Sequence, residues 1–318
     1  MYLKPDPFFI QPNSRATIHL YNGTFDKSEN VIARNRMADV SLVGGGKRTA
    51  VDSTAWSERD NMTVLSFQAG EAGTWVAGVS THPRNIEMSA ADFNGYLEHD
   101  GVLDMLKWRK DNDALGQDAV EKYSKHVKTV FQVGEHTSED WKTVLGYPIE
   151  FIPRENPYDL HPGHTLEVQL LWDGKPLPNQ LVYVGSSAGM HSHDPETEHS
   201  HTTSGAHQHD PGEDTEEGHS HSLVNQLRTD SEGVVKVDLT TEGTWYLRTI
   251  YMTASEEPGL THESNWATLT FAVGQGHSHT HDGAVHDHGE ATGIPSYVYW
   301  IGSLLLLAGL FFWFKRRS

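Results

Sequence analysis

The chain contains no cysteine. This absence excludes disulfide bonds, thiolate metal sites, iron–sulfur clusters and cysteine nucleophiles, although it leaves the redox compartment open. Positive charge is also scarce, because 24 Lys and Arg stand against 43 Asp and Glu, which gives a formal net charge of −19. No run rich in Lys or Arg occurs before the last four residues. The sequence therefore lacks the basic surface with which proteins follow the phosphates of nucleic acids.

Apolar residues make up 36% of the 318 residues. This share is low for one compact core, but it is compatible with β-rich domains that carry polar insertions. At roughly 150 residues per domain, the length predicts two folded units with appendages. Histidine is the residue in excess: the chain has 21, and most of them lie in two segments.

The body of the chain predicts a mainly β fold with two β-sandwich domains, Ig-like or prealbumin-like. Strand-like runs occur at 8–11, 17–21, 39–43, 63–68 and 74–80, so residues 1–88 are predicted to form an N-terminal β-rich domain. A second series occurs at 144–153, 165–172, 180–184, 233–239, 244–252 and 266–273. We assign residues 144–275 to an Ig-like β-sandwich with a His-rich insertion at 190–223.

Between these two series, residues 89–143 predict a short helical connector. Ser89 with Asp92 three residues later is typical of a helix N-cap. A second helical piece is predicted at about 118–130. Apolar residues recur at loosely helical spacing in the first piece: Phe93, Leu97, Leu103, Leu106 and Trp108.

The C-terminal end predicts a single membrane-spanning helix. Residues 297–314 read YVYWIGSLLLLAGLFFWF, 18 residues without a charge. As a helix they would span about 27 Å of a bilayer core of roughly 30 Å. Interfacial aromatics at both ends and a basic Lys-Arg-Arg run directly afterwards favour a transmembrane helix at 295–314 and a cytoplasmic tail at 315–318. The rest of the chain is then expected on the extracytoplasmic, periplasmic side of the cell membrane.

Export of the body requires a signal sequence, yet residues 1–10 show no charged region followed by an apolar stretch. We expect that the chain lacks its first residues. Two alternatives stay open: a tail anchor inserted against the charge rule, and a C-terminal sorting signal that is cleaved after export.

Thirteen histidines carry the predicted chemistry. The insertion holds four His-x-His pairs: His191 with His193, His199 with His201, His207 with His209, and His219 with His221. A His-rich juxtamembrane linker at 276–294 adds five: His277, His279, His281, His286 and His288. Alternate residues of an extended chain point to the same side, about 6.6 Å apart, so both imidazoles of a pair can reach one cation.

Eight carboxylates are interleaved with the four pairs, and no Lys or Arg occurs between residues 176 and 227. Neutral imidazole is a borderline ligand that suits Ni(II), Co(II), Zn(II) and Cu(II). The two segments therefore predict several exchangeable sites for a divalent transition-metal ion of this class, without a rigid catalytic site. Nothing in the spacing selects one metal.

Two other interpretations of the His-rich segments stay open. A polar insertion of this length and composition cannot bury apolar area and is typical of solvated, disordered chain. The insertion could also respond to pH, because eight carboxylates give it a formal charge of −8 that approaches zero when its eight histidines are protonated. Either interpretation makes the protein a cell-surface β-sandwich module with structural or interaction functions.

Eight further histidines are scattered, and we predict surface or ordinary structural positions for them. Two of these, which flank Pro162-Gly163, could meet one ion across a turn. The eight are His19, His82, His99, His126, His136, His161, His164 and His262.

Enzyme motifs lack their required context, and we predict that the chain is not an enzyme. Residues 185–189 fit the G-x-S-x-G pattern around Ser187, but the His-rich segment follows where a helix should hold the nucleophile. His262-Glu263 lacks the second histidine of a zincin, and no dinucleotide or phosphate-loop signature occurs.

Several motifs together resemble a known family, and the resemblance covers about residues 1–184 and 223–273. The motifs are Tyr2-Leu3-Lys4-Pro5, Ser89-Ala90-Ala91-Asp92-Phe93, EKYSKHVK at 121–128, LGYPIE at 145–150, Asn156-Pro157-Tyr158, DGKPL at 173–177, GTWYLR at 243–248 and WATLTF at 266–271. They are similar to the NikM-like, domain-of-unknown-function group of periplasmic components linked to nickel and cobalt uptake.

This resemblance implies two β-sandwich domains and an exported location. It also suggests that ions held near the bilayer are handed to a separate metal permease, since one membrane helix cannot form a transport path. One departure matters. Members of the group begin their mature chain with a His-Asp pair before the Tyr-Leu-x-Pro run, whereas Met1 stands there in this chain. No N-terminal histidine is therefore carried over as a ligand.

Overall fold

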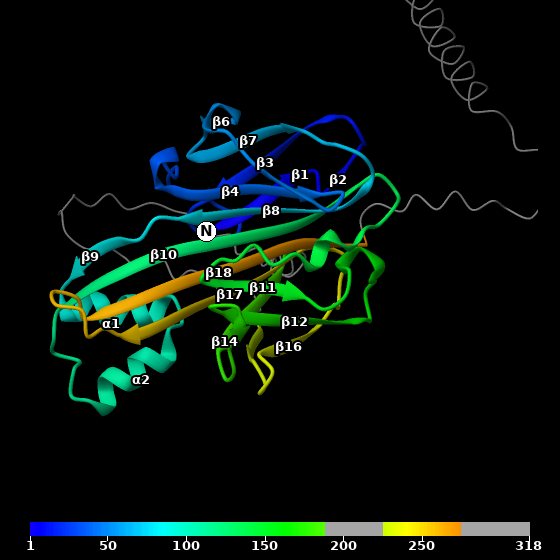
Figure 1. The fold of residues 1–318 in the computed structure, drawn as a ribbon. Coiled ribbons are helices and arrows are strands. Elements are labelled where there is room, and N and C mark those ends of the chain that lie inside the picture. The colour runs from blue at the N-terminus through cyan, green and yellow to red at the C-terminus, as the bar shows by residue number, and fades with distance from the viewer. Residues whose placement is uncertain (188–224, 275–318) are drawn as a thin grey trace, which may run out of the picture. The chain divides into compact units, whose positions relative to one another are not determined.

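A 15-residue strand, β10 (Ala119–Val133), lies at the centre of the fold (Figure 1). The structure is a computed structural model that describes residues 1–187 and 225–274, and these belong to one compact unit. β10 pairs in parallel with β18 (His262–Val273) and antiparallel with β8 (Gly73–Thr81). It therefore joins strands from both halves of the chain into one sheet.

The described strands form three sheets, and β10 belongs to the largest. This ten-stranded sheet runs in the order β15 (Asn225–Arg228), β14 (Leu181–Ser186), β17 (Gly243–Ala254), β18, β10, β8, β4 (Met37–Gly44) and β5 (Lys47–Ala50), with β2 (Phe9–Ile10) and β9 (Arg84–Met88) also paired to β10. An N-terminal sheet contains β1 (Tyr2–Asp6), β3 (Arg15–Tyr21), β7 (Met62–Gln68) and β6 (Trp56–Arg59). The third sheet contains β11 (Ile149–Pro153), β12 (Thr165–Trp172), β13 (Lys175–Pro176) and β16 (Val234–Asp238).

Both smaller sheets pack against the ten-stranded sheet through apolar side chains. Phe131 of β10 and Leu65 of β7 belong to the core that includes the N-terminal sheet. Val130 of β10, Val168 of β12 and Leu247 of β17 belong to the core that includes the third sheet. This β-sandwich packing confirms the mainly β prediction. The division into two domains at residues 88 and 144 stays a prediction.

Every predicted strand run overlaps a strand of the structure, and the bounds of most agree within two residues. Among the described residues, four short 3-10 helices occur in the connections: Arg34–Arg36, Ser53–Ala55, Glu139–Lys142 and Pro157–Asp159. Strands that the sequence did not reveal are β1, β5, β6, β9, β10, β13 and β15.

The first helical piece of the connector is confirmed. It consists of α1 (Ala90–His99) and α2 (Leu103–Asp111), and the Asp92 amide donates to Ser89 Oγ at 3.2 Å as the N-cap. Phe93 and Leu97 are fully buried, whereas Leu103 and Trp108 are 39% and 41% exposed. The helical spacing therefore identified the helices but overestimated how much of their apolar surface is covered.

The second helical piece, predicted at about 118–130, is wrong, because these residues form β10. Val120, Val127 and Thr129 are β-branched and favour a strand. From residue 126 to residue 133 every side chain is buried, because β10 is covered on both faces. Such a strand has no alternation of apolar and polar residues by which a sequence pattern could reveal it.

Lys128 of β10 forms a buried ion pair with Glu150 of β11, with 3.0 Å between Nζ and Oε2. The two side chains are 1% and 2% exposed. Lys128 Nζ also donates to the Thr143 carbonyl, and the amides of Leu145 and Gly146 donate to the Glu150 carboxylate. Burial lowers the pKa of Lys128, while Glu150 opposes that shift. Each charge is tolerated because its hydrogen-bonding capacity is used.

We predict that Lys128→Met destabilises the protein by roughly 3–5 kcal/mol, because the variant leaves the Glu150 carboxylate buried without its cation. The free energy of unfolding in urea measures the loss. Lys122→Met is the matched control on the same strand, since Lys122 pairs with Glu257 at the surface, and it should cost less than about 1 kcal/mol. Equal losses in the two variants would contradict the prediction.

Candidate functional site

The thirteen histidines predicted to bind metal lie outside the described residues, in the stretches 188–224 and 275–318. The predicted transmembrane helix lies there as well. The first stretch contains His191, His193, His199, His201, His207, His209, His219 and His221, and the second contains His277, His279, His281, His286 and His288. Their assignment as metal ligands therefore stays a prediction.

The described part of the chain contains neither a candidate membrane-spanning helix nor a candidate metal site with three or more protein ligands. Within residues 1–187 and 225–274, no helix is long and apolar enough to cross a membrane. In the same residues, no group of three or more His, Asp or Glu is arranged to hold a metal ion. The structure does show the residues of the fold to which the two His-rich stretches are attached.

These junctions lie at one end of the ten-stranded sheet (Figure 1). Ser186, at the end of β14, pairs with Trp245 of β17, and Trp245 pairs with Phe271 near the end of β18. Asn225, where the chain re-enters the sheet as β15, lies opposite Val184 of β14. Because neighbouring strands lie about 4.8 Å apart, the ends of β14 and β18 are about 10 Å apart.

Hydrogen bonds and packing hold these junctions in place. The Thr244 amide donates to Ser187 Oγ at 3.0 Å, and Trp245 Nε1 donates to the Thr241 carbonyl at 3.0 Å. Val273 is completely buried. Gly274 follows with a φ of +75°, and a Cβ there would lie 2.5 Å from the Glu242 side chain. The two His-rich stretches therefore start from fixed points on the sheet.

Ser187, the central serine of the G-x-S-x-G pattern, lies just beyond β14. Its hydroxyl accepts the Thr244 amide described above, which ties the end of β14 to the start of β17. The residues that would form the helix of a nucleophile elbow lie outside the described part of the chain. The motif therefore has an observed role in holding the junction.

The eight scattered histidines are divided between surface and interior, as predicted. His19 is partly buried, two are buried, and the remaining five are exposed: His82, His99, His136, His161 and His164. The two buried histidines, His126 and His262, differ in how their ring nitrogens are used.

His126 has hydrogen-bond partners at both ring nitrogens. Ser80 Oγ lies 2.9 Å from Nδ1, while Ser124 Oγ and Asn265 Oδ1 lie 3.0 and 3.2 Å from Nε2. Burial lowers the pKa of His126, against the smaller raising effects of Asn265 and Glu150. The ring is 3% exposed. It acts as a buried link between β8, β10 and β18.

His262 is also 3% exposed, but only Nδ1 has a partner, the Thr261 hydroxyl at 2.7 Å. Nε2 is buried without a hydrogen-bond partner among the described residues. The ring packs against Phe93, with 4.6 Å between centroids, and is nearly perpendicular to the Trp108 ring, with 6.3 Å between centroids. Burial, and then the nearby Arg109, lower the pKa of His262 to about 4. The ring is therefore neutral at physiological pH.

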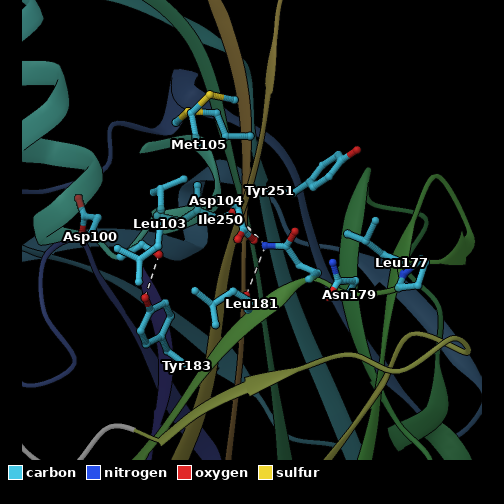
Figure 2. Close-up of a pocket in the computed structure, with 15 residues that line it drawn as sticks. Asp100, Leu103, Asp104, Met105, Leu177, Asn179, Leu181, Tyr183, Ile250 and Tyr251 are labelled. Carbon is cyan, nitrogen blue, oxygen red and sulfur yellow. Dashed lines mark hydrogen bonds between the residues drawn. The ribbon is translucent and has the colours of Figure 1, made fainter. Parts of the chain in front are cut away.

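A cavity of about 280 Å³ lies between the α1–α2 turn and the strands β14 and β17 (Figure 2). Several of its polar groups are already paired. Asp104 forms an ion pair with Arg228, and Tyr183 donates its hydroxyl hydrogen to the Gly101 carbonyl at 2.8 Å. Gln180 donates to Thr249 and to the backbone of β17. The lining of the cavity contains no histidine, so the cavity is no candidate for the predicted metal chemistry.

Comparison with known proteins gives one family. The family model described as "Domain of unknown function (DUF4198)" matches residues 1–253. No curated protein sequence matches the chain.

Solved structures give only distant similarity. A structure of the D0-D1 domain of intimin is 12% identical, with 85% of this chain and 96% of that chain covered and a TM-score of 0.19. A DUF4785 family protein from Legionella pneumophila is 10% identical, with 57% and 37% covered and a TM-score of 0.21. A Salmonella alpha-2-macroglobulin variant is 10% identical, with 83% and 14% covered and a TM-score of 0.19. These values are too low to inform the function.

Because the buried His262 ring is neutral, we predict that the protein loses stability in mild acid. Between pH 6.5, the ordinary pKa of histidine, and about 4, the unfolded chain binds a proton at this ring that the folded chain does not. The free energy of unfolding therefore falls as the pH falls through this window. His126 contributes with the same sign, so His262→Phe should reduce the slope without abolishing it.

Urea unfolding at several pH values between about 7 and 4 measures this slope. His82→Asn, at an exposed histidine, is the control and should keep the slope of the unmodified protein. A slope that is unchanged in His262→Phe would show that this ring does not cause the acid sensitivity.

Proposed function

This chain belongs to the DUF4198 family, and on that premise we propose that it is a membrane-anchored extracytoplasmic protein that binds divalent transition-metal ions through its two His-rich segments. The family is described only as a domain of unknown function, so the proposal rests on the chemistry of this chain. The two segments act together as one reservoir of exchangeable ions.

The position of the junctions carries the proposal. The first segment leaves the sheet after Ser187 and the second after Gly274, at strand ends about 10 Å apart. Two ligand-bearing chains tethered to neighbouring points meet at a high effective concentration, which decreases as the tethers are placed farther apart. Attachment at one sheet end therefore lets histidines of both segments reach the same ion.

The ligand chemistry supports the same function. Thirteen imidazoles, all of them at His-x-His spacing and interspersed with carboxylates, offer nitrogen ligands suited to Ni(II), Co(II), Zn(II) and Cu(II). Repeated pairs without a fixed Cys/His framework favour several sites of moderate affinity over one rigid site. Protons compete for the imidazoles below about pH 6.5, so metal binding should weaken in mild acid.

Further features belong to the same proposal. Residues 295–314 form a transmembrane helix, which keeps the second segment close to the bilayer, and the folded part consists of two sandwich domains on the periplasmic side. The chain is a NikM-like component of nickel or cobalt uptake, and a separate metal permease receives the ions. The charge-free run at 297–314 and the family motifs quoted above support these statements.

Calorimetry of the full chain in detergent micelles tests the proposal. We expect Ni(II), Zn(II), Co(II) and Cu(II) to bind with a stoichiometry above one. The matched control is a full chain in which all thirteen segment histidines are replaced by Asn, which keeps the length and the carboxylates. This control should lose most of the bound equivalents, because it lacks the imidazoles.

Equal metal binding by the two proteins would overturn the proposal. That result would favour the alternative function, a cell-surface module whose His-rich segments are spacers.

A further inference from the structure

Two histidines of the folded part lie together in a turn between the 3-10 helix Pro157–Asp159 and β12. The ring centroids of His161 and His164 are 5.9 Å apart, and both residues are exposed. They are the pair that flanks Pro162-Gly163. The turn thus brings two imidazoles close together on the surface.

The turn is held at both ends by the sandwich. Before it, Tyr158 and Leu160 are buried, and Tyr158 donates its hydroxyl hydrogen to the Val130 carbonyl of β10 at 2.8 Å. After it, the Leu239 amide donates to the His164 carbonyl at 2.9 Å. Within it, the Gly163 amide donates to the Leu239 carbonyl at 2.7 Å. The backbone that carries the two rings is therefore fixed before any ion binds.

Gly163 makes this turn possible. Its φ is +96°, a conformation that residues with a Cβ rarely adopt. The His164 amide donates to the His161 carbonyl at 3.1 Å and closes the turn. As a result, residues 161 and 164 are neighbours across a tight loop.

Nδ1 of His164 already faces His161. The His161 amide donates to His164 Nδ1 at 3.4 Å, so this lone pair is directed toward the His161 side of the turn. The bond is long for an N–H donor and correspondingly weak. A cation placed at that lone pair replaces a weak hydrogen bond with a coordination bond.

We propose that His161 and His164 form a surface site for one divalent transition-metal ion of the Ni(II), Cu(II) and Zn(II) class, with water as the remaining ligands. Metal–nitrogen distances of about 2.0–2.1 Å at a tetrahedral angle would place two coordinated ring centroids about 5 Å apart. The observed 5.9 Å closes to this value by rotation of exposed side chains. Two protein ligands make an exchangeable site.

The site lies at the same end of the sandwich as the junctions of the His-rich segments. Leu239, which pairs with the turn, shortly precedes Gly243, the first residue of β17. β17 in turn pairs with the ends of β14 and β18. Because both ligands belong to the folded part, this site does not depend on the proposed function of the segments.

The test uses the full chain in which the thirteen segment histidines are replaced by Asn, so that only the eight scattered histidines remain. Cu(II) and Ni(II) are titrated by calorimetry, and the Cu(II) complex is examined by electron paramagnetic resonance. We expect one equivalent of bound ion and hyperfine coupling to two imidazole nitrogens.

In this background, His161→Asn and His164→Asn are the decisive variants. Loss of even an outer-shell partner of a metal site costs about 10- to 100-fold in affinity, so loss of one of two imidazoles should weaken binding by at least about tenfold. His82→Asn, at a lone exposed histidine, should leave the affinity unchanged. An unaltered melting temperature in all three variants checks that the fold is intact.

Two results would overturn this site: no bound ion in the background chain, or binding of equal affinity after His161→Asn and His164→Asn. Both are distinguishable from failure of the proposed function. That failure is seen instead as an absence of extra bound equivalents in the unmodified chain relative to the background chain.

Discussion

The pairing of β10 with β18 is the constraint on which the rest of the structure depends. The two strands run in parallel from the pair Glu121–His262 to the pair Thr129–Thr270, which joins distant parts of the sequence. β10 contributes to the apolar cores beneath both smaller sheets. Since β17 and β14 follow β18 across the sheet, the register of this pair also determines where the two His-rich segments begin. One backbone ladder thus links the stability of the sandwich to the geometry of the proposed metal capture.

Histidine has two opposite uses in this account, and burial separates them. His126 and His262 are removed from water, have lowered pKa values and pack in the interior as neutral rings. His161 and His164 are exposed on a fixed turn, where a cation can reach the pair. In the proposed function, the segment histidines extend the second use to chain that is rich in carboxylates. The proposed metal binding therefore requires no change in the packed core.

Much of the fold could be predicted because local patterns specify it. Apolar runs between turn residues located the strands of both series, and Ser89 with Asp92 located the start of α1. β10 was missed because its Glu and Lys residues resemble a helix surface, and their partners come from other strands, as Lys128 and Glu150 illustrate.

The candidate sites were predictable to different degrees. Pro162-Gly163 indicated the turn that brings His161 and His164 together, because proline and glycine in sequence are a local turn signal. The approach of Ser186 to Phe271 could not be predicted, since it follows from strand order and not from any residue pattern. The segment histidines are visible in the sequence alone, and their chemistry stays a prediction.

The most direct test of the account is the distance between the two His-rich segments with and without metal. Because the chain has no cysteine, Ser204→Cys and Ala284→Cys provide two unique positions for spin labels, one in each segment. Double electron–electron resonance should show a shorter and narrower distance distribution when Zn(II) is added, because the proposed metal binding would let ions bridge segments that start about 10 Å apart. The change should disappear when the thirteen histidines are replaced by Asn. A distribution that Zn(II) leaves unaltered in the histidine-containing chain would contradict the account.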